Sequence, residues 1–220
     1  MFEASKIISE NNDWMTFVFL FILVLLTANK LLFNNRILHT GTLFLQKKFL
    51  LIYFGKDKSV VFNLFQIVLF SIKVLSISLI IYHINNYFKI NSSLEGFVGY
   101  IIIASCLTLY FVIHYLLGVF LAAILNFQKA YKKVVYDKLS YFNNLILWIL
   151  PFLVVYSYTS VLRVLFFNIL LFLFIGLLVV RYLLLLTNNK NLIFNNIFYF
   201  ILYLCALEIA PFVIILKLTI

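Results

Sequence analysis

Charged residues are scarce in this chain: only 11% of its 220 residues are Asp, Glu, Lys or Arg, whereas 65% are hydrophobic. A soluble domain is about a quarter charged and about half apolar. The hydrophobic excess does not fit inside one core, because a chain this short still exposes much of its surface when it folds. The composition excludes a soluble globular domain and predicts a protein whose outward faces are dissolved in a lipid bilayer.

Acidic groups are the scarcer of the charged residues, with 7 Asp and Glu against 17 Lys and Arg. A net charge of +10 could indicate a nucleic-acid-binding protein. The basic residues, however, lie mostly in connections between apolar runs, which is typical of the cytoplasmic loops of membrane proteins. We therefore expect the lipid bilayer as a partner and no nucleic acid.

Motifs of catalysis and cofactor binding are missing. Cys106 and Cys205 lie inside apolar runs, so they are interpreted as packing residues rather than as a disulfide or metal site. There is no Walker loop, GxGxxG, GxSxG or HExxH. Intramembrane proteolysis would need a Ser–His pair, two aspartates or a zinc site, and Asp13, Asp57 and Asp137 all lie outside the apolar runs. The three histidines differ in predicted depth, which argues against haem ligation. We expect no catalytic residue, no metal, no cofactor and no enzymatic activity.

Six stretches are long and apolar enough to cross a membrane, which takes about 20 residues for about 30 Å of hydrocarbon. They are 15–33, 60–84, 97–127, 139–158, 161–186 and 197–218. We predict an all-α integral membrane fold of about six helices, forming one polytopic domain over 1–220. Segment 34–59 mixes apolar residues with Arg36, Lys47 and Lys48. It is predicted to be amphipathic and interfacial, with its basic side chains toward anionic lipid, or else covered by a partner protein.

The distribution of Lys and Arg predicts the orientation. Connections 28–59, 126–138 and 181–196 hold twelve of these residues, and the connections and termini on the other side hold four. Because basic residues accumulate in cytoplasmic loops, both termini are expected to face away from the cytoplasm. Arg163 and Arg181 lie near span ends, where their long side chains can extend to water.

Three ionisable residues are predicted at similar depth inside the bilayer: Lys73, His114 and Glu208. Charges at this depth are costly and often mark functional sites. Lys73 and Glu208 could form a buried ion pair that fixes helix packing, with His114 hydrogen-bonded nearby. Alternatively, Glu208 is a proton or cation site whose ionisation is tuned by Lys73 or His114. A third alternative pairs one of the charges with another subunit. We favour the structural pair.

Other polar, small and kinking residues are expected to organise the helix contacts. The polar seam of the second span consists of Asn63, Gln66, Lys73, Ser76 and His83, at spacings of three and seven. In the fourth span, Asn143 and Asn144 are predicted to hydrogen-bond to a neighbouring helix. The small pairs that should allow close packing are Gly118 with Ala122 and Ala206 with Ala210. Pro151 and Pro211 are expected to kink their helices.

The last predicted span carries a recognisable stretch. Residues 198–211, FYFILYLCALEIAP, resemble the closing signature of an uncharacterised Bacteroidota inner-membrane family, the domain of unknown function 4271. The resemblance extends to Trp14, to the basic connection 34–54 and to 141–143 before Pro151. It implies the inner membrane of a Gram-negative bacterium, so that both termini would be periplasmic. It makes Glu208 and Pro211 signature positions, but it implies no activity.

The expected function is that of a non-enzymatic membrane subunit or scaffold of a bacterial envelope complex. Such a chain would act through helix–helix and interfacial contacts with a membrane-protein partner or as a homo-oligomer. The alternative is a small transporter or a proton- or ion-coupled component that uses Glu208, Lys73 and His114. Water access distinguishes the two, because a transporter needs a hydrated path to mid-depth, whereas a scaffold buries these groups in packed side chains.

Overall fold

The computed structural model describes residues 13–44, 63–89, 96–124, 128–159 and 162–188, and all regular secondary structure in them is helical. The elements are α1 (Asp13–Phe33), α2 (Asn35–Gly41), α4 (Leu64–Phe88), α5 (Gly96–Ile124), α6 (Gln128–Tyr158) and α7 (Arg163–Asn188). All of these except α2 are long and apolar enough to cross a membrane, with mean hydropathy from 1.6 to 2.8. The prediction of a helical multi-span protein is therefore confirmed. The sixth predicted span, 197–218, lies outside the described residues.

α6 is longer than the sequence analysis predicted. It begins at Gln128 rather than at 139, so most of the expected loop 126–138 is helix. The stretch contains no Pro or Gly that would stop a helix, and its apolar Tyr131 and Val135 lie one turn apart on a buried face. The loop prediction was wrong because hydropathy detects only the part of a helix that crosses lipid. A helix extends at little cost once it has been nucleated.

α4 begins with a side-chain cap. The Asn63 side chain accepts a hydrogen bond from the backbone N–H of Phe65 at 3.4 Å, as asparagine often does at a helix N-terminus. At the other end, Lys89 has the left-handed φ of 50° that terminates the helix. The structure thus places Asn63 at the cap of α4, one residue before the helix that carries the rest of the predicted polar seam.

α2 packs against α6 rather than presenting all its polar groups to lipid. Trp148 on α6 donates its indole N–H to the carbonyl of Gly41 at 3.0 Å, and the ring of Phe44 stacks on Tyr141. Arg36 is buried, and its guanidinium lies 4.3 Å from the centroid of the Phe65 ring. The expectation that the basic side chains of segment 34–59 face lipid is therefore wrong for Arg36, because an aromatic face attracts its charge. Lys47 and Lys48 lie outside the described residues.

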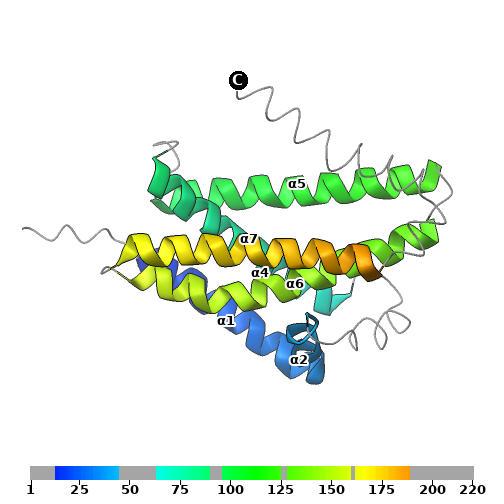
Figure 1. The fold of residues 1–220 in the computed structure, drawn as a ribbon, viewed down its shortest axis with the longest axis horizontal. Coiled ribbons are helices and arrows are strands. Elements are labelled where there is room, and N and C mark those ends of the chain that lie inside the picture. Colours follow the sequence, from blue (N-terminus) through cyan, green and yellow to red (C-terminus); the bar gives the residue numbers. More distant parts are fainter. Residues whose placement is uncertain (1–12, 45–62, 90–95, 125–127, 160–161, 189–220) are drawn as a thin grey trace, which may run out of the picture.

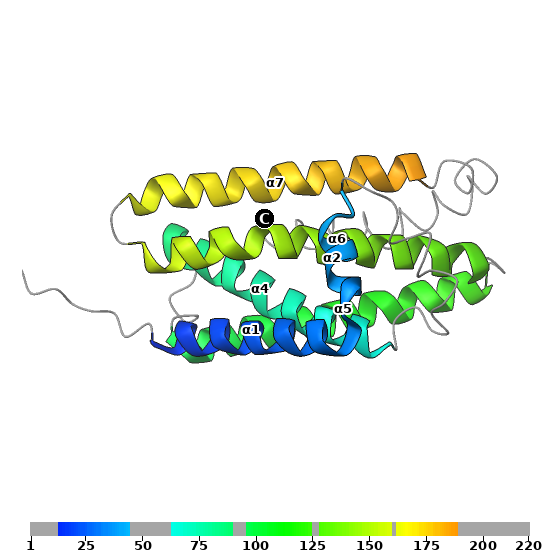
Figure 2. The ribbon, with the colours of Figure 1, turned by 90° about the horizontal axis from the view of Figure 1, so that it is seen from below.

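The bundle is built around α4 and α6. In Figure 1 α5, α6 and α7 run roughly along one axis and α1 and α4 slope across it, and Figure 2 shows α4 and α6 between α7 on one side and α1 on the other. In the most apolar stretch of each helix, 61% of residues are buried in α4 and 56% in α6, but only 22% in α1, 17% in α5 and 11% in α7. The two central helices therefore supply most of the core.

The end of the bundle near the start of α1 is closed by aromatic rings. Trp14 lies edge-on to Tyr82 of α4, with ring centroids 5.1 Å apart, and its ring is tilted against Phe97 and Tyr100 of α5. Such pairs add to the free energy of burial through their electrostatic complementarity. One residue thereby joins three helices.

Candidate functional site

Lys73 lies at the centre of the bundle on α4 and is 1% exposed. Its ammonium faces three aromatic rings, from Phe70 at 4.6 Å, Phe111 at 4.7 Å and Phe142 at 5.4 Å, measured to the ring centroids. These rings come from α4, α5 and α6 respectively. A desolvated ammonium over an aromatic face gains about 2 kcal/mol or more, because the face carries negative potential. The rings therefore offset part of the cost of burying this charge.

Arg181 on α7 joins the same group, although the sequence analysis expected it to extend to water. It is buried, its guanidinium carbon lies 4.6 Å from the Phe142 centroid, and its Nη2 donates to the carbonyl of Lys138 at 3.5 Å. The expectation is wrong because the Phe142 ring and the Lys138 carbonyl of α6 bind the guanidinium inside the bundle. The position of Arg181 near the end of a predicted span did not indicate that its side chain would turn into the bundle. We refer to Phe70, Lys73, Phe111, Phe142 and Arg181 as the cation–aromatic layer.

The cation–aromatic layer concentrates positive charge. Arg181 and Lys138 are close enough to Lys73 to repel it electrostatically. The ring of Phe142 is shared between Lys73 and Arg181. Glu208, the carboxylate that the sequence analysis paired with Lys73, lies outside the described residues, so that ion pair remains a prediction.

The third ionisable residue predicted at mid-depth is His114. It lies half-buried on α5, with its ring centroid 5.9 Å from that of Tyr110, one turn earlier on the same helix. On α5 it is Phe111, rather than His114, that supplies a ring to Lys73. The contact between Lys73 and α5 is therefore made by the phenyl ring of Phe111.

The polar seam joins the two central helices. The amide nitrogen of Asn143 on α6 donates to Oε1 of Gln66 on α4 at 2.9 Å, and both side chains are buried. Ser76 and Asn144 are also buried, and among the described residues neither the Ser76 hydroxyl nor the Asn144 amide has a hydrogen-bonding partner. Amide pairs between helices are a usual means of fixing helix register in lipid.

His83 and Ser157 form a second side-chain link between α4 and α6, which the sequence analysis did not find because 74 positions separate them. His83 Nε2 lies 3.0 Å from Ser157 Oγ. This is the distance expected of a nucleophilic Ser–His pair. The Ser157 hydroxyl, however, donates to the carbonyl of Leu153 at 2.8 Å, which leaves Nε2 of His83 as the donor in the link. A catalytic histidine would instead accept the serine proton.

The surroundings of this pair also favour a structural role. His83 is 2% exposed, and among the described residues its Nδ1 has no partner that could orient it as a base. Its ring lies edge-on to Tyr156, with centroids 4.8 Å apart. We interpret the pair as a link that fixes the C-terminal ends of α4 and α6 relative to each other.

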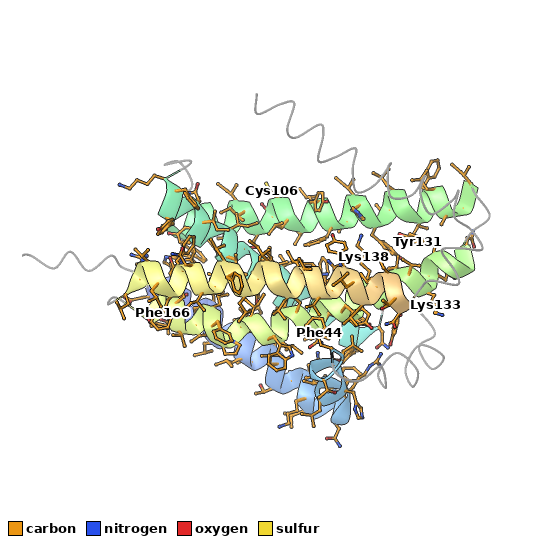
Figure 3. The ribbon with its side chains drawn as sticks, in the orientation of Figure 1. Phe44, Cys106, Tyr131, Lys133, Lys138 and Phe166 are labelled. Atoms are coloured by element: carbon orange, nitrogen blue, oxygen red, sulfur yellow. The ribbon has the colours of Figure 1, made fainter. Side chains whose placement is uncertain are left out.

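The small residues Gly118 and Ala122 on α5 pack against the side chain of Tyr131 rather than against the backbone of a neighbouring helix. A Cβ on Gly118 would overlap the hydroxyl of Tyr131 and lie 2.9 Å from its Cζ. Ala122, one turn further along, packs with Tyr131 and Val135 of α6. Figure 3 shows Tyr131 between the two helices, close to the end where they are joined. Gly118 and Ala122 thus allow an aromatic ring to fill the space between α5 and α6.

The remaining candidate residues divide between the described and undescribed parts of the chain. Pro151 is exposed, and α6 continues through it to Tyr158. Cys106 is exposed on the outer side of α5 (Figure 3), so its interpretation as a packing residue is wrong. Cys205, Ala206, Ala210 and Pro211 lie outside the described residues. Within the described ranges, no three His, Cys, Asp or Glu side chains are grouped so as to hold a metal ion.

The described residues form five long apolar helices that enclose polar and cationic side chains, which defines a multi-pass α-helical membrane protein. The chain belongs to the family described as Domain of unknown function (DUF4271), whose model matches residues 15–219. The match covers nearly the whole chain, including residues 197–218, where the sequence predicts the sixth span. No curated protein and no solved structure matches it.

Proposed function

We propose that the chain is a non-enzymatic membrane subunit or scaffold of a bacterial envelope complex, in the inner membrane with both termini periplasmic. It acts through helix–helix and interfacial contacts. The observation that carries this proposal is the enclosure of Lys73, which is 1% exposed beneath rings from three helices. The family supplies no activity, so the proposal rests on this geometry.

The enclosure supports packing over transport for a physical reason. A transported ion or a relayed proton must reach its site through water or through a chain of hydrogen-bonding groups. Around Lys73 the structure places aromatic carbon, and the amides of Gln66 and Asn143 bond to each other. The groups shown around the Lys73 ammonium are aromatic rings, so such a layer supports a role in fixing how α4, α5, α6 and α7 meet.

The outer helices supply contact surfaces for such a subunit. On α7, Phe172 is 82% exposed and, with Asn168 and Gly176 of the same helix, lines an open hollow of about 1090 Å³. On α5, Phe120 is likewise exposed. Lipid, a second copy or a partner helix would cover these faces in the membrane.

Site-specific photo-crosslinking in intact membranes tests the proposal. A photoreactive amino acid at Phe172 or Phe120 should yield a defined crosslinked protein, which mass spectrometry then identifies as a second copy or another membrane protein. The same group at Phe167, which is buried against Tyr87, should crosslink only within the chain. A clean monomer from both exposed positions, and also after purification in several mild detergents, would contradict a scaffold.

One observation favours the alternative, a small transporter or proton- or ion-coupled component that uses Glu208, Lys73 and His114. Lys73 has two further cations, Arg181 and Lys138, in its electrostatic range, and buried charge often marks a functional site. For this alternative, Glu208→Gln should abolish transport while the protein still assembles in the membrane. Loss of the folded protein in Glu208→Gln would instead support a structural ion pair.

A further inference from the structure

The helices α5 and α6 are longer than a bilayer crossing requires. They contain 29 and 31 residues. At about 1.5 Å per residue they extend about 44 and 47 Å, against about 30 Å of hydrocarbon. We expect the excess where the two helices are joined, because the first turns of α6 carry Lys132 and Lys133, which favour the lipid headgroups over hydrocarbon. This places the first turns of α6 and the last turns of α5 at the depth expected for the lipid headgroups.

A groove opens between α5 and α6 at this depth. Its volume is about 240 Å³. It is lined by Tyr115, Val119 and Ala122 of α5 and by Gln128, Tyr131, Lys132 and Val135 of α6. Within each helix the lining residues recur at three or four positions, so each helix presents one stripe. Tyr131 is seated against Gly118, which sets the spacing of the two helices beside the groove.

The chemistry of the lining changes along the groove. Gln128 and Lys132 lie at the end near the helix connection, whereas Val119 and Val135 lie toward the hydrocarbon. Lys132 is exposed, and among the described residues no acidic side chain lines the groove to neutralise it. The ammonium offers three hydrogen-bond donors and a positive charge at headgroup depth. A phosphodiester would accept hydrogen bonds from Lys132 and Gln128 at the end near the helix connection. The glycerol and the start of the acyl chains would lie against Val119 and Val135 at the other end.

We propose that this groove binds the headgroup phosphate of an anionic phospholipid from the leaflet at the lysine-rich end of the bundle. The phosphate lies against Lys132 and Gln128, and the glycerol backbone lies between Val119 and Val135. The acyl chains then continue along the exposed apolar face of α5, which includes Leu116. The site is independent of the scaffold proposal, because it needs only the hairpin of α5 and α6.

Native mass spectrometry of the full-length protein, released from detergent micelles, tests the site with phosphatidylglycerol and phosphatidylcholine as probes. The wild type should retain phosphatidylglycerol in preference to phosphatidylcholine. Lys132→Gln should weaken phosphatidylglycerol binding about fivefold, which is the effect of one lysine at an anionic lipid surface. The control Lys133→Gln removes the same charge one residue away, outside the groove lining, and should change binding less than twofold.

A second variant tests the shape of the site without changing its charge. Val119 is 40% exposed, so Val119→Phe can fill the groove without disturbing the core, and it should also weaken phosphatidylglycerol binding. Gel filtration and circular dichroism confirm that each variant is folded, and Val119→Phe decides the question if Lys132→Gln does not fold.

Four results would overturn the proposal. Equal losses in Lys132→Gln and Lys133→Gln would indicate diffuse surface charge, and equal retention of the two lipids would indicate a neutral site. Displacement of the lipid by millimolar inorganic phosphate would indicate a site for a free anion. Unchanged phosphatidylglycerol binding in folded Val119→Phe would show that the lipid lies elsewhere.

Discussion

The central helices α4 and α6 and the outer helices α5 and α7 differ in a property that hydropathy does not report. The most apolar stretches of α4 and α5 have nearly equal hydropathy, 2.3 and 2.2, yet 61% of the residues are buried in the first and 17% in the second. α7 is the most apolar of these helices, at 2.8, and the least buried, at 11%. In lipid, apolar side chains gain little by leaving the surface, and polar side chains determine which helices meet.

The largest expected effect in this comparison is the loss of the Lys73 side chain from the centre of the bundle. Lys73→Ala removes a fully buried four-carbon stem and its ring contacts, and it should lower the free energy of unfolding by about 2–4 kcal/mol. Unfolding of the purified protein in mixed detergent micelles, followed by circular dichroism, measures this change. Lys89→Ala, at the exposed end of the same helix, is the control and should change stability by about 0.5 kcal/mol or less.

Lys73→Met separates volume from charge at the same position. It keeps most of the buried stem, loses the cation–π contacts and removes the cost of burying an ammonium, so it should cost about 1 kcal/mol or less. If Lys73→Met is as damaging as Lys73→Ala, the charge itself is needed. That result would favour a buried pair with Glu208 over a cation held by aromatic rings alone.

The next largest effect is expected from replacing one of two glycines that lie within helices. Gly118→Ala places a Cβ against the Tyr131 ring and should lower the free energy of unfolding by about 1–3 kcal/mol. Gly176→Ala on α7 places its new Cβ more than 4 Å from every other described side chain, so it should raise stability by about 0.5–1 kcal/mol, because alanine favours the helix. Thermal unfolding of the two variants, measured under the same conditions, shows whether each substitution raises or lowers stability. Equal destabilisation would show that the outer face of α7 is as closely packed as the contact of α5 with α6.

The smallest effect concerns the amide bond within the polar seam. A double-mutant cycle with Gln66→Leu and Asn143→Leu should give a coupling energy of about 0.6 kcal/mol and at most about 1.7 kcal/mol. The matched cycle uses Thr16→Val and Tyr158→Phe, which remove an exposed bond of 2.9 Å between α1 and α6. Its coupling should be smaller, because water and detergent headgroups can replace the partner. A larger coupling at the exposed bond would contradict the distinction between centre and periphery.

The spans and the polar seam were predictable from the sequence, whereas the arrangement of the helices was not. Hydropathy located the five described helices that are long and apolar enough to cross a membrane, and the spacing of Gln66 and Lys73 indicated a face directed at other helices. The extension of α6 through Lys132 was missed because a polar stretch can remain helical outside lipid. The inward turn of Arg181 and the link between His83 and Ser157 depend on contacts between distant segments. No local pattern in a single sequence encodes such contacts.

Water access to the centre of the bundle tests the account most directly. Ser76 is 1% exposed and lies one turn from Lys73, and Ser76→Cys changes only its side-chain Oγ to sulfur. This variant and Lys30→Cys, at the exposed end of α1, are prepared in a background with Cys106→Ser and Cys205→Ser. Each is then treated in native membranes with a small water-soluble maleimide. A sealed packing layer predicts fast labelling of Lys30→Cys and labelling of Ser76→Cys only after denaturation. Fast labelling of Ser76→Cys in the folded protein would reveal a hydrated path, contradict the scaffold and support the transport alternative.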